Sequence, residues 1–173
     1  MSWVVDKAHT SLGFSVKHMM ISAVRGTFAD FSGDVDLDVN DFTKSKITGE
    51  VEVASIYTRQ PERDKHLLSP DFFDVEKFPK ISYQSTSIER KSDDEYVVTG
   101  DLTIKDTTRP LSLNVIFSGV RVNPYGVRVA GFEVTGKLSR KDFGLLWNVS
   151  LETGGVVVGD EVKLNLDVEV KEE

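Results

Sequence analysis

The sequence of 173 residues contains no cysteine, so disulfide bonds, thiolate metal ligands and a cysteine nucleophile are all excluded. Long apolar runs are also missing, because no more than three apolar residues follow one another, as at residues 156–158. A membrane-spanning helix needs about 20 such residues, so none is expected. The three histidines include no H-x-x-x-H pair, and the sequence therefore predicts no metal site of that kind.

Positive charge is scarce, with 21 Lys and Arg against 28 Asp and Glu and a formal net charge of −7. The basic residues never exceed two in a row, whereas a nucleic-acid surface needs clustered positive charge. Nucleic acid is therefore not an expected partner. Hydrophobic residues make up 39% of the chain, which excludes a disordered protein, and the length predicts a single domain over residues 1–173.

Alternation of polar and apolar residues dominates the chain. From Glu161 to Lys171 the two kinds alternate without interruption, which is typical of a strand with one buried and one solvent-facing side. Similar patterns predict eight or more strands, and the first of them could be split in two. The predicted strands cover residues 3–17, 23–39, 44–57, 80–91, 95–105, 110–122, 127–139 and 161–171.

Residues 61–79 depart from this alternation and predict one or two short helices, with a second helix start at Ser69-Pro70-Asp71. So many strands with so little helix predict an all-β protein, either an antiparallel sandwich or a barrel. The inward phases carry Phe14, Phe28, Phe117 and Phe132. A closed sheet of about eight strands is either filled by such side chains or holds one small ligand, and alternation alone leaves both open.

His18 continues the phase of Leu12, Phe14 and Val16 and is expected to point inward with them. A neutral imidazole both donates and accepts a hydrogen bond. His18 could therefore be a structural residue at the barrel end, a polar anchor for the head of an apolar ligand, or a catalytic base. The sequence shows no clear second titratable group in the same phase to support the third interpretation.

Short motifs follow one another along nearly the whole chain. The first are W-x-x-D-x-x-H-x-x-L-x-F-x-V-x-H at residues 3–18 and V-R-G-x-F at residues 24–28. The most specific stretch, residues 63–75, combines R-D-x-H-L with D-F-F-D-V, and R-x-D-F-G-L follows at residues 140–145. Each motif is weak alone, but in this order they resemble the YceI-like family of lipocalin-like polyisoprenoid-binding proteins.

The resemblance implies an all-β fold: an extended antiparallel eight-stranded lipocalin-like β-barrel with one or two short helices around residues 61–79. The implied function is non-enzymatic binding, with storage or transport, of a long-chain amphiphilic lipid in the pore. Such a lipid is a polyisoprenoid, an isoprenoid quinone or its precursor, or a fatty acid derivative; no cofactor is implied. The residues expected to contact it are Phe14, Val16, His18, Phe28, Leu67, Phe72, Leu102, Ile104, Val115, Phe117 and Trp147.

Other functions remain as alternatives. One is a small-barrel enzyme that acts on an apolar substrate with His18 as acid or base. Another is a filled barrel that serves as a protein-interaction module, although the solvent-facing phases carry Asp, Glu, Lys and Thr rather than apolar residues. A homodimer is left open. Residues 1–7 lack the pattern of a secretion signal, which predicts a cytoplasmic protein, or a periplasmic one if a leader has been removed.

Overall fold

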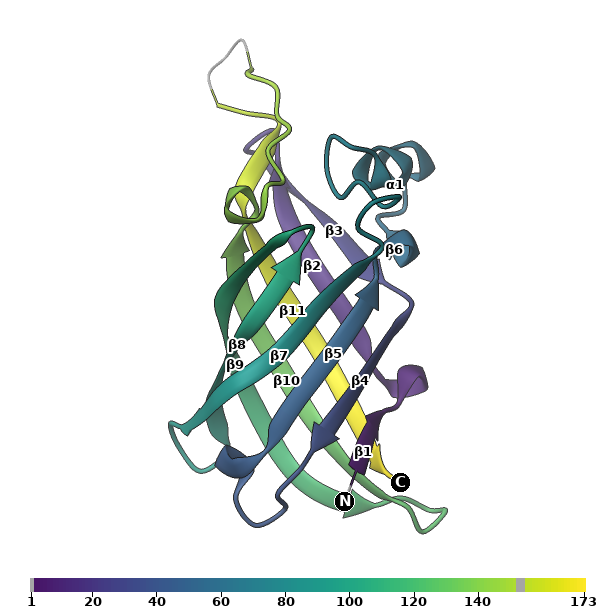
Figure 1. The fold of residues 1–173 in the computed structure, drawn as a ribbon, viewed down its shortest axis with the longest axis vertical. Helices are drawn as coiled ribbons and strands as arrows, with labels where there is room; N and C mark the ends of the chain where they lie inside the picture. Colours follow the sequence, from purple (N-terminus) through teal and green to yellow (C-terminus); the bar gives the residue numbers. More distant parts are fainter. Residues whose placement is uncertain (1, 152–154) are drawn as a thin grey trace.

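The computed structural model describes residues 2–151 and 155–173 and shows a closed antiparallel barrel (Figure 1). Eight strands form the ring in the order β1-β4-β5-β7-β8-β9-β10-β11, and β1 pairs with β11 to close it. The bounds of these strands are β1 (Ser2–Val5), β4 (Phe31–Asp36), β5 (Lys46–Glu52), β7 (Lys80–Arg90), β8 (Glu95–Ile104), β9 (Thr107–Val122), β10 (Arg128–Ser139) and β11 (Val158–Glu172). The eight-stranded barrel predicted from the family resemblance is thereby confirmed.

Three further strands extend the barrel at one end, because three of the predicted strands are each broken once. They are β2 (Ser11–His18), β3 (Ser22–Phe28) and β6 (Ile56–Tyr57). A short 3₁₀ helix, η1 (Lys7–His9), separates β1 from β2, and η3 (Val53–Ser55) separates β5 from β6. β2 pairs with the first half of β11, β3 pairs with β2, and β6 pairs with the end of β3. The predicted split of the first strand is therefore correct.

The structure contains one α-helix in the predicted helical region, α1 (Pro61–Leu68). The Gln60 side chain caps it by accepting a hydrogen bond from the Glu62 N–H, and Pro61 occupies the first helical turn. The predicted second helix does not form, because the chain after Ser69 folds into successive turns in which Asp74 has a φ of 52°. Neither α1 nor any other described helix is long and apolar enough to cross a membrane.

Both termini lie at one end of the barrel (Figure 1). Aromatic side chains fill the interior at this end. The 3₁₀ helix η2 (Phe42–Lys44) lies between β4 and β5, and the Asp41 carboxylate caps it by accepting a hydrogen bond from the Thr43 N–H. Phe42 is only 3% exposed. Its ring centroid lies 4.9 Å from that of Tyr96, 5.0 Å from Phe117 and 5.4 Å from Phe132. This cluster closes the barrel at that end.

α1 lies at the opposite end of the barrel, where side chains tie it to the segment that precedes it. The Thr58 hydroxyl donates a short hydrogen bond to the Asp64 carboxylate. Arg63 Nε donates to Thr58 Oγ1 at 2.9 Å, and its Nη2 donates to the Thr58 carbonyl at 2.6 Å. Thr58 is buried, so these bonds hold the helix to the barrel in one orientation.

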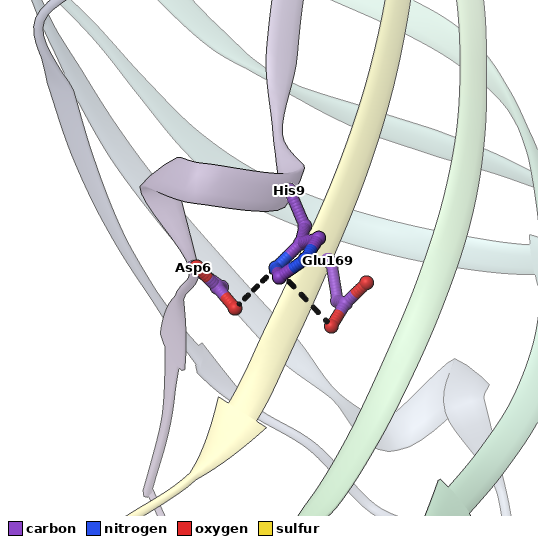
Figure 2. Close-up of side chains that lie close together, drawn as sticks. All are labelled: Asp6, His9 and Glu169. Atoms are coloured by element: carbon purple, nitrogen blue, oxygen red, sulfur yellow. Dashed lines mark hydrogen bonds and ion pairs between the residues drawn. The ribbon is translucent and has the colours of Figure 1, made fainter. Parts of the chain in front are cut away.

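On the outside of the barrel, Asp6, His9 and Glu169 meet where β1 ends and η1 begins (Figure 2). Asp6 accepts hydrogen bonds from the Ala8 N–H at 3.0 Å and from His9 Nδ1 at 2.9 Å, and His9 lies 3.9 Å from a Glu169 oxygen. These ligand atoms lie within 4.8 Å of one another, but both Asp6 oxygens already hold the bend in the chain. We therefore assign the cluster a structural role at the break between β1 and β2.

Phe42→Ala should destabilise the protein by about 3–5 kcal/mol, because it removes the central ring of the closed end and leaves a cavity there. Urea denaturation followed by tryptophan fluorescence measures the change. Val39→Ala, on the same connection but 44% exposed, is the matched control and should change stability by less than about 0.5 kcal/mol. Equal effects of the two substitutions would contradict the closure assigned to Phe42.

His9 should titrate above its ordinary pKa of 6.5, because it is hydrogen-bonded to the Asp6 carboxylate and lies near Glu169. The pKa of Asp6 is correspondingly lowered from 3.8 by that hydrogen bond. A raised histidine pKa contributes stability below the unfolded value and loses it as pH rises through the folded value. His9→Gln should therefore reduce stability more at pH 6 than at pH 9.

NMR titration of the imidazole tests the same assignment directly, since Asp6→Asn should lower the midpoint of His9. An unchanged midpoint in this variant would show that Asp6 is not the partner of His9.

Candidate ligand cavity

The barrel encloses a cavity of about 710 Å³ whose wall is formed by inward-facing side chains from nearly every strand. One continuous part of the wall comes from β2 and β11, where Val16 pairs with Val162, Phe14 with Leu164 and Leu12 with Leu166. These six residues point inward and yet are only half-buried, because one side of each faces empty space rather than another side chain. The volume lies within the range of about 300–1,000 Å³ usual for small-molecule sites.

Gly26 keeps part of this cavity open. It pairs with Phe14 across β2 and β3, and the Phe14 ring lies directly over it. A β-carbon at position 26 would overlap the ring, so any larger residue would push Phe14 away from the wall. The Phe14 ring centroid lies 5.5 Å from that of Phe28, which lies 6.3 Å from that of Phe73. Three rings therefore line one side of the cavity.

The floor of the cavity is the aromatic cluster at the end with the termini. Phe42 and Phe132 line the cavity, but Phe117 does not. The Phe117 ring stacks on Phe132 at 5.0 Å between centroids and on Phe42 at the same distance. The cavity lining therefore does not include Phe117, because the inward phase takes this residue into the aromatic cluster beyond the cavity.

The other end is open beside α1, since the exposed residues Gln60 and Glu62 belong to the lining. At this mouth, His66 lies between two aromatic rings. Its centroid is 4.8 Å from that of Trp147 and 5.1 Å from that of Phe72, and its Nε2 lies 2.8 Å from an Asp71 oxygen. The cluster joins α1 and the following turns to the segment around Trp147, on the other side of the mouth.

Arg140 is a buried cation on the cavity wall, 3% exposed, in the 3₁₀ helix η4 (Arg140–Phe143). Its guanidinium donates to four backbone carbonyls, those of Leu145, Trp147, Val158 and Gly159, at 2.5–3.2 Å. Burial lowers the pKa of Arg140, and the nearby Asp160 carboxylate opposes that shift. Arg140 therefore fixes both chain segments that flank the mouth on this side.

Two other polar side chains lie on the wall. His18 lies at the end of β2, and among the described residues its imidazole makes no hydrogen bond. Tyr83 crosses over Gly100 and donates from its hydroxyl to the Leu111 carbonyl at 3.2 Å. Burial raises the pKa of Tyr83 above its ordinary value. In the part of the chain that the structure describes, neither has a carboxylate hydrogen-bonded to it, as an acid–base pair would require.

The structure brings together most of the residues that the sequence proposed as a site. All except Phe117 lie on one cavity wall: Phe14, Val16, His18, Phe28, Leu67, Phe72, Leu102, Ile104, Val115 and Trp147. Whether each contacts a ligand stays a prediction. Sequence reasoning missed Arg140 and Tyr83 as lining residues. Arg140 opens the R-x-D-F-G-L motif, but alternation gives no sign that its charge is buried.

Comparison with known proteins agrees with this geometry. A model of the YceI-like domain matches residues 3–170. A UPF0312 protein of Staphylococcus aureus (strain N315) is 43% identical over 169 residues, which cover 97% of this chain and 96% of the relative. The solved YceI protein of Campylobacter jejuni is 32% identical with a TM-score of 0.77, over 97% of this chain and 96% of that one.

Two more distant structures share the fold. Burkholderia cenocepacia BcnA has a TM-score of 0.79 at 24% identity, over 95% of this chain and 98% of that one. A polyisoprenoid binding domain from Saccharophagus degradans, described as implicated in plant cell wall breakdown, has a TM-score of 0.71 at 12% identity. It is matched over 99% of this chain and 98% of its own. From residue 3 to residue 170, in sequence and in barrel architecture, the chain belongs to the YceI-like family.

Proposed function

We propose that the protein binds one long-chain amphiphilic lipid in the barrel and stores or transports it without chemical conversion. The observation that carries this proposal is the cavity, which is lined mainly by aliphatic and aromatic side chains, closed at one end and open at the other. An apolar chain enters such a cavity favourably because it leaves water, at roughly 25 cal/mol per Å² of surface removed.

The distribution of polar groups suggests how the lipid is oriented. Most ionisable residues of the lining belong to elements that reach the open end: Lys17 and His18 at the end of β2, Glu62, Arg63 and His66 of α1, and Arg140 of η4. Glu50 of β5 and Tyr83 of β7 also belong to the lining. The floor, by contrast, consists of Phe42 and Phe132. We infer that the tail points to the floor and that a polar head stays at the mouth, where water and these side chains can solvate it.

The class of cargo follows from the same features. A polyisoprenoid, an isoprenoid quinone or its precursor, and a fatty acid derivative all combine a long apolar chain with one small polar end. The similarity to the polyisoprenoid binding domain of Saccharophagus degradans supports the first of these. A ligand of about 40 heavy atoms gaining roughly 0.3 kcal/mol each would bind with about 12 kcal/mol, near nanomolar.

An enzyme with His18 as acid or base is less well supported. General acid–base catalysis needs a proton acceptor or donor held in place, and catalytic histidines are commonly oriented by a hydrogen-bonded partner. In residues 2–151 and 155–173, the His18 imidazole has no such partner. A protein-interaction module with a filled interior does not agree with a cavity of about 710 Å³.

Lipid that co-purifies with the protein tests the proposal most directly. Native mass spectrometry of freshly purified protein should show added mass, and organic extraction should release one amphiphilic lipid per chain. If nothing is released, added prenyl or acyl chains should bind to the empty protein. Failure of both experiments would refute a lipid-binding role.

Filling the hollow part of the barrel should block binding without unfolding the protein. Val16 is half-buried against the cavity, so Val16→Trp should change stability little and weaken binding of a fluorescent lipid at least about tenfold. Val170 is 0% exposed in the packed core and does not line the cavity, so Val170→Trp is the matched control and should cost about 1–3 kcal/mol of stability. Equally large stability losses would mean that the interior around Val16 is a packed core.

A further inference from the structure

Two apolar segments lie exposed at the open end of the barrel. The turn between β2 and β3 carries Met19, Met20 and Ile21, which are 42%, 59% and 82% exposed. The segment after η4 carries Leu146 and Val149, which are 63% and 47% exposed. The turn has no Lys, Arg, Asp or Glu between residues 17 and 25, and between residues 142 and 160 the sequence has one charged residue, Glu152.

These two segments are neighbours and form one apolar rim beside the mouth. The Met19 N–H donates to the Val157 carbonyl at 2.8 Å, and the Val157 N–H donates to the Val149 carbonyl at 3.0 Å. A β-carbon at Gly155 would lie 3.0 Å from Met20 Cγ. Figure 1 shows both segments at the end of the barrel opposite the termini. The rim therefore continues the apolar lining of the cavity out to the surface.

The backbone conformation of the turn between β2 and β3 does not explain why methionine occupies it. A hydrogen bond from the Ile21 N–H to the His18 carbonyl closes the turn, and Met19 and Met20 have φ values of 51° and 65°. Both central residues of a type I′ turn have positive φ, and Asn-Gly is the sequence that adopts it most easily. Bulky side chains rarely occupy this region. Two exposed methionines in a strained turn therefore point to a role in contact with an apolar surface.

Strand register also brings four cations together on the outer face below this rim, where Glu161 of β11 is an exposed acidic neighbour. Lys137 of β10 pairs with Lys163 of β11, Lys163 with Ser15 of β2, and Ser15 with Arg25 of β3. Lys17 lies one step nearer the turn in the same phase as Ser15. All four cations are exposed, and within the described ranges none forms an ion pair.

We propose that the open end of the barrel docks onto the surface of an anionic phospholipid bilayer. The side chains of Met19, Met20 and Ile21 enter the interface, and the row of cations faces the lipid head groups. Arg25 lies three residues beyond Ser22, or roughly 10 Å from the turn, which matches apolar insertion of roughly 5–10 Å. The mouth then opens toward the acyl-chain region, where a long-chain lipid resides.

This inference extends the proposed function, because docking would let a lipid pass between bilayer and cavity without crossing water. Docking and lipid binding can be measured separately. Binding of lipid-free protein to vesicles measures docking, and binding of a lipid in the absence of vesicles measures the proposed function of the cavity. A protein that binds lipid but does not dock onto vesicles would overturn only the docking. A protein that docks but binds no lipid in its cavity would overturn only the proposed function.

Co-sedimentation with sucrose-loaded vesicles tests the docking. Lipid-free protein should sediment with vesicles of phosphatidylglycerol and phosphatidylcholine and much less with phosphatidylcholine alone. The double variant Met19→Asn with Met20→Gly should lower the partition coefficient at least about tenfold, which corresponds to about 1.4 kcal/mol. Its thermal stability should be equal or higher, because Asn-Gly suits the turn. The matched control, Val122→Ser with Tyr125→Ser, changes exposed apolar residues at the closed end and should bind like wild type.

The cations are tested by Arg25→Gln with Lys163→Gln, which should weaken binding to the anionic vesicles about fivefold for each charge removed, and less at high salt. The inference is overturned if wild type does not sediment with anionic vesicles, or if the turn variant and its control lose binding equally. It is also overturned if phosphatidylcholine alone binds as well as the anionic mixture. A dimer seen in analytical ultracentrifugation and lost in the turn variant would overturn it too, in favour of a second copy of the chain on the rim.

Discussion

The barrel depends on one edge of β11, which pairs with two different segments of the chain. The last part of β11 pairs with β1, from Val5↔Val170 to Trp3↔Glu172, and the earlier part pairs with β2, from Val158↔His18 to Asp167↔Ser11. Between them the chain leaves the ladder, and the Thr10 hydroxyl replaces the missing strand by accepting from the Glu169 N–H at 3.0 Å. Because β11 bridges this break, the ring closes at one end while β2 and β3 reach beyond it at the other.

This arrangement places the packed core at one end of the barrel and the cavity toward the other. At the closed end, rings around Phe42 pack at ordinary interior distances and supply the core. Toward the open end, residues such as Phe14 and Val162 face a cavity and therefore lack the neighbours that a packed interior would give them. A bound lipid chain would provide those neighbours, so stability and occupancy are thermodynamically linked in a protein of this shape.

Period-two alternation predicted an all-β antiparallel fold, because it reports which side of a strand faces inward, and the family resemblance supplied the eight-stranded barrel. Alternation does not report how far along the barrel axis a residue lies. For this reason Phe117 was predicted to face the pore, whereas its ring packs against Phe42 and Phe132 at the closed end. Packing density is invisible to alternation as well, so the choice between cavity and core required side-chain positions.

Contacts between residues far apart in the sequence, and the register of paired strands, could not be predicted either, because local spacing does not encode them. Glu169 reaches His9 only because β11 returns to the start of the chain, and no local spacing encodes that contact. The basic residues that look scattered in sequence meet in one row only after β10, β11, β2 and β3 pair. Arg140 is buried through bonds to carbonyls of residues that follow it, whereas a charged residue is normally expected at the surface.

The position of both termini at the closed end makes the chain suitable for circular permutation. The Glu173 N–H donates to the Ser2 carbonyl at 3.0 Å, so the first and last described residues are already neighbours. A short peptide linker could therefore join them, and new ends could be opened in an exposed turn such as that around Tyr125 without altering a single strand pairing. Circular permutation and surface immobilisation are both open to this barrel from its base, with the mouth left unobstructed.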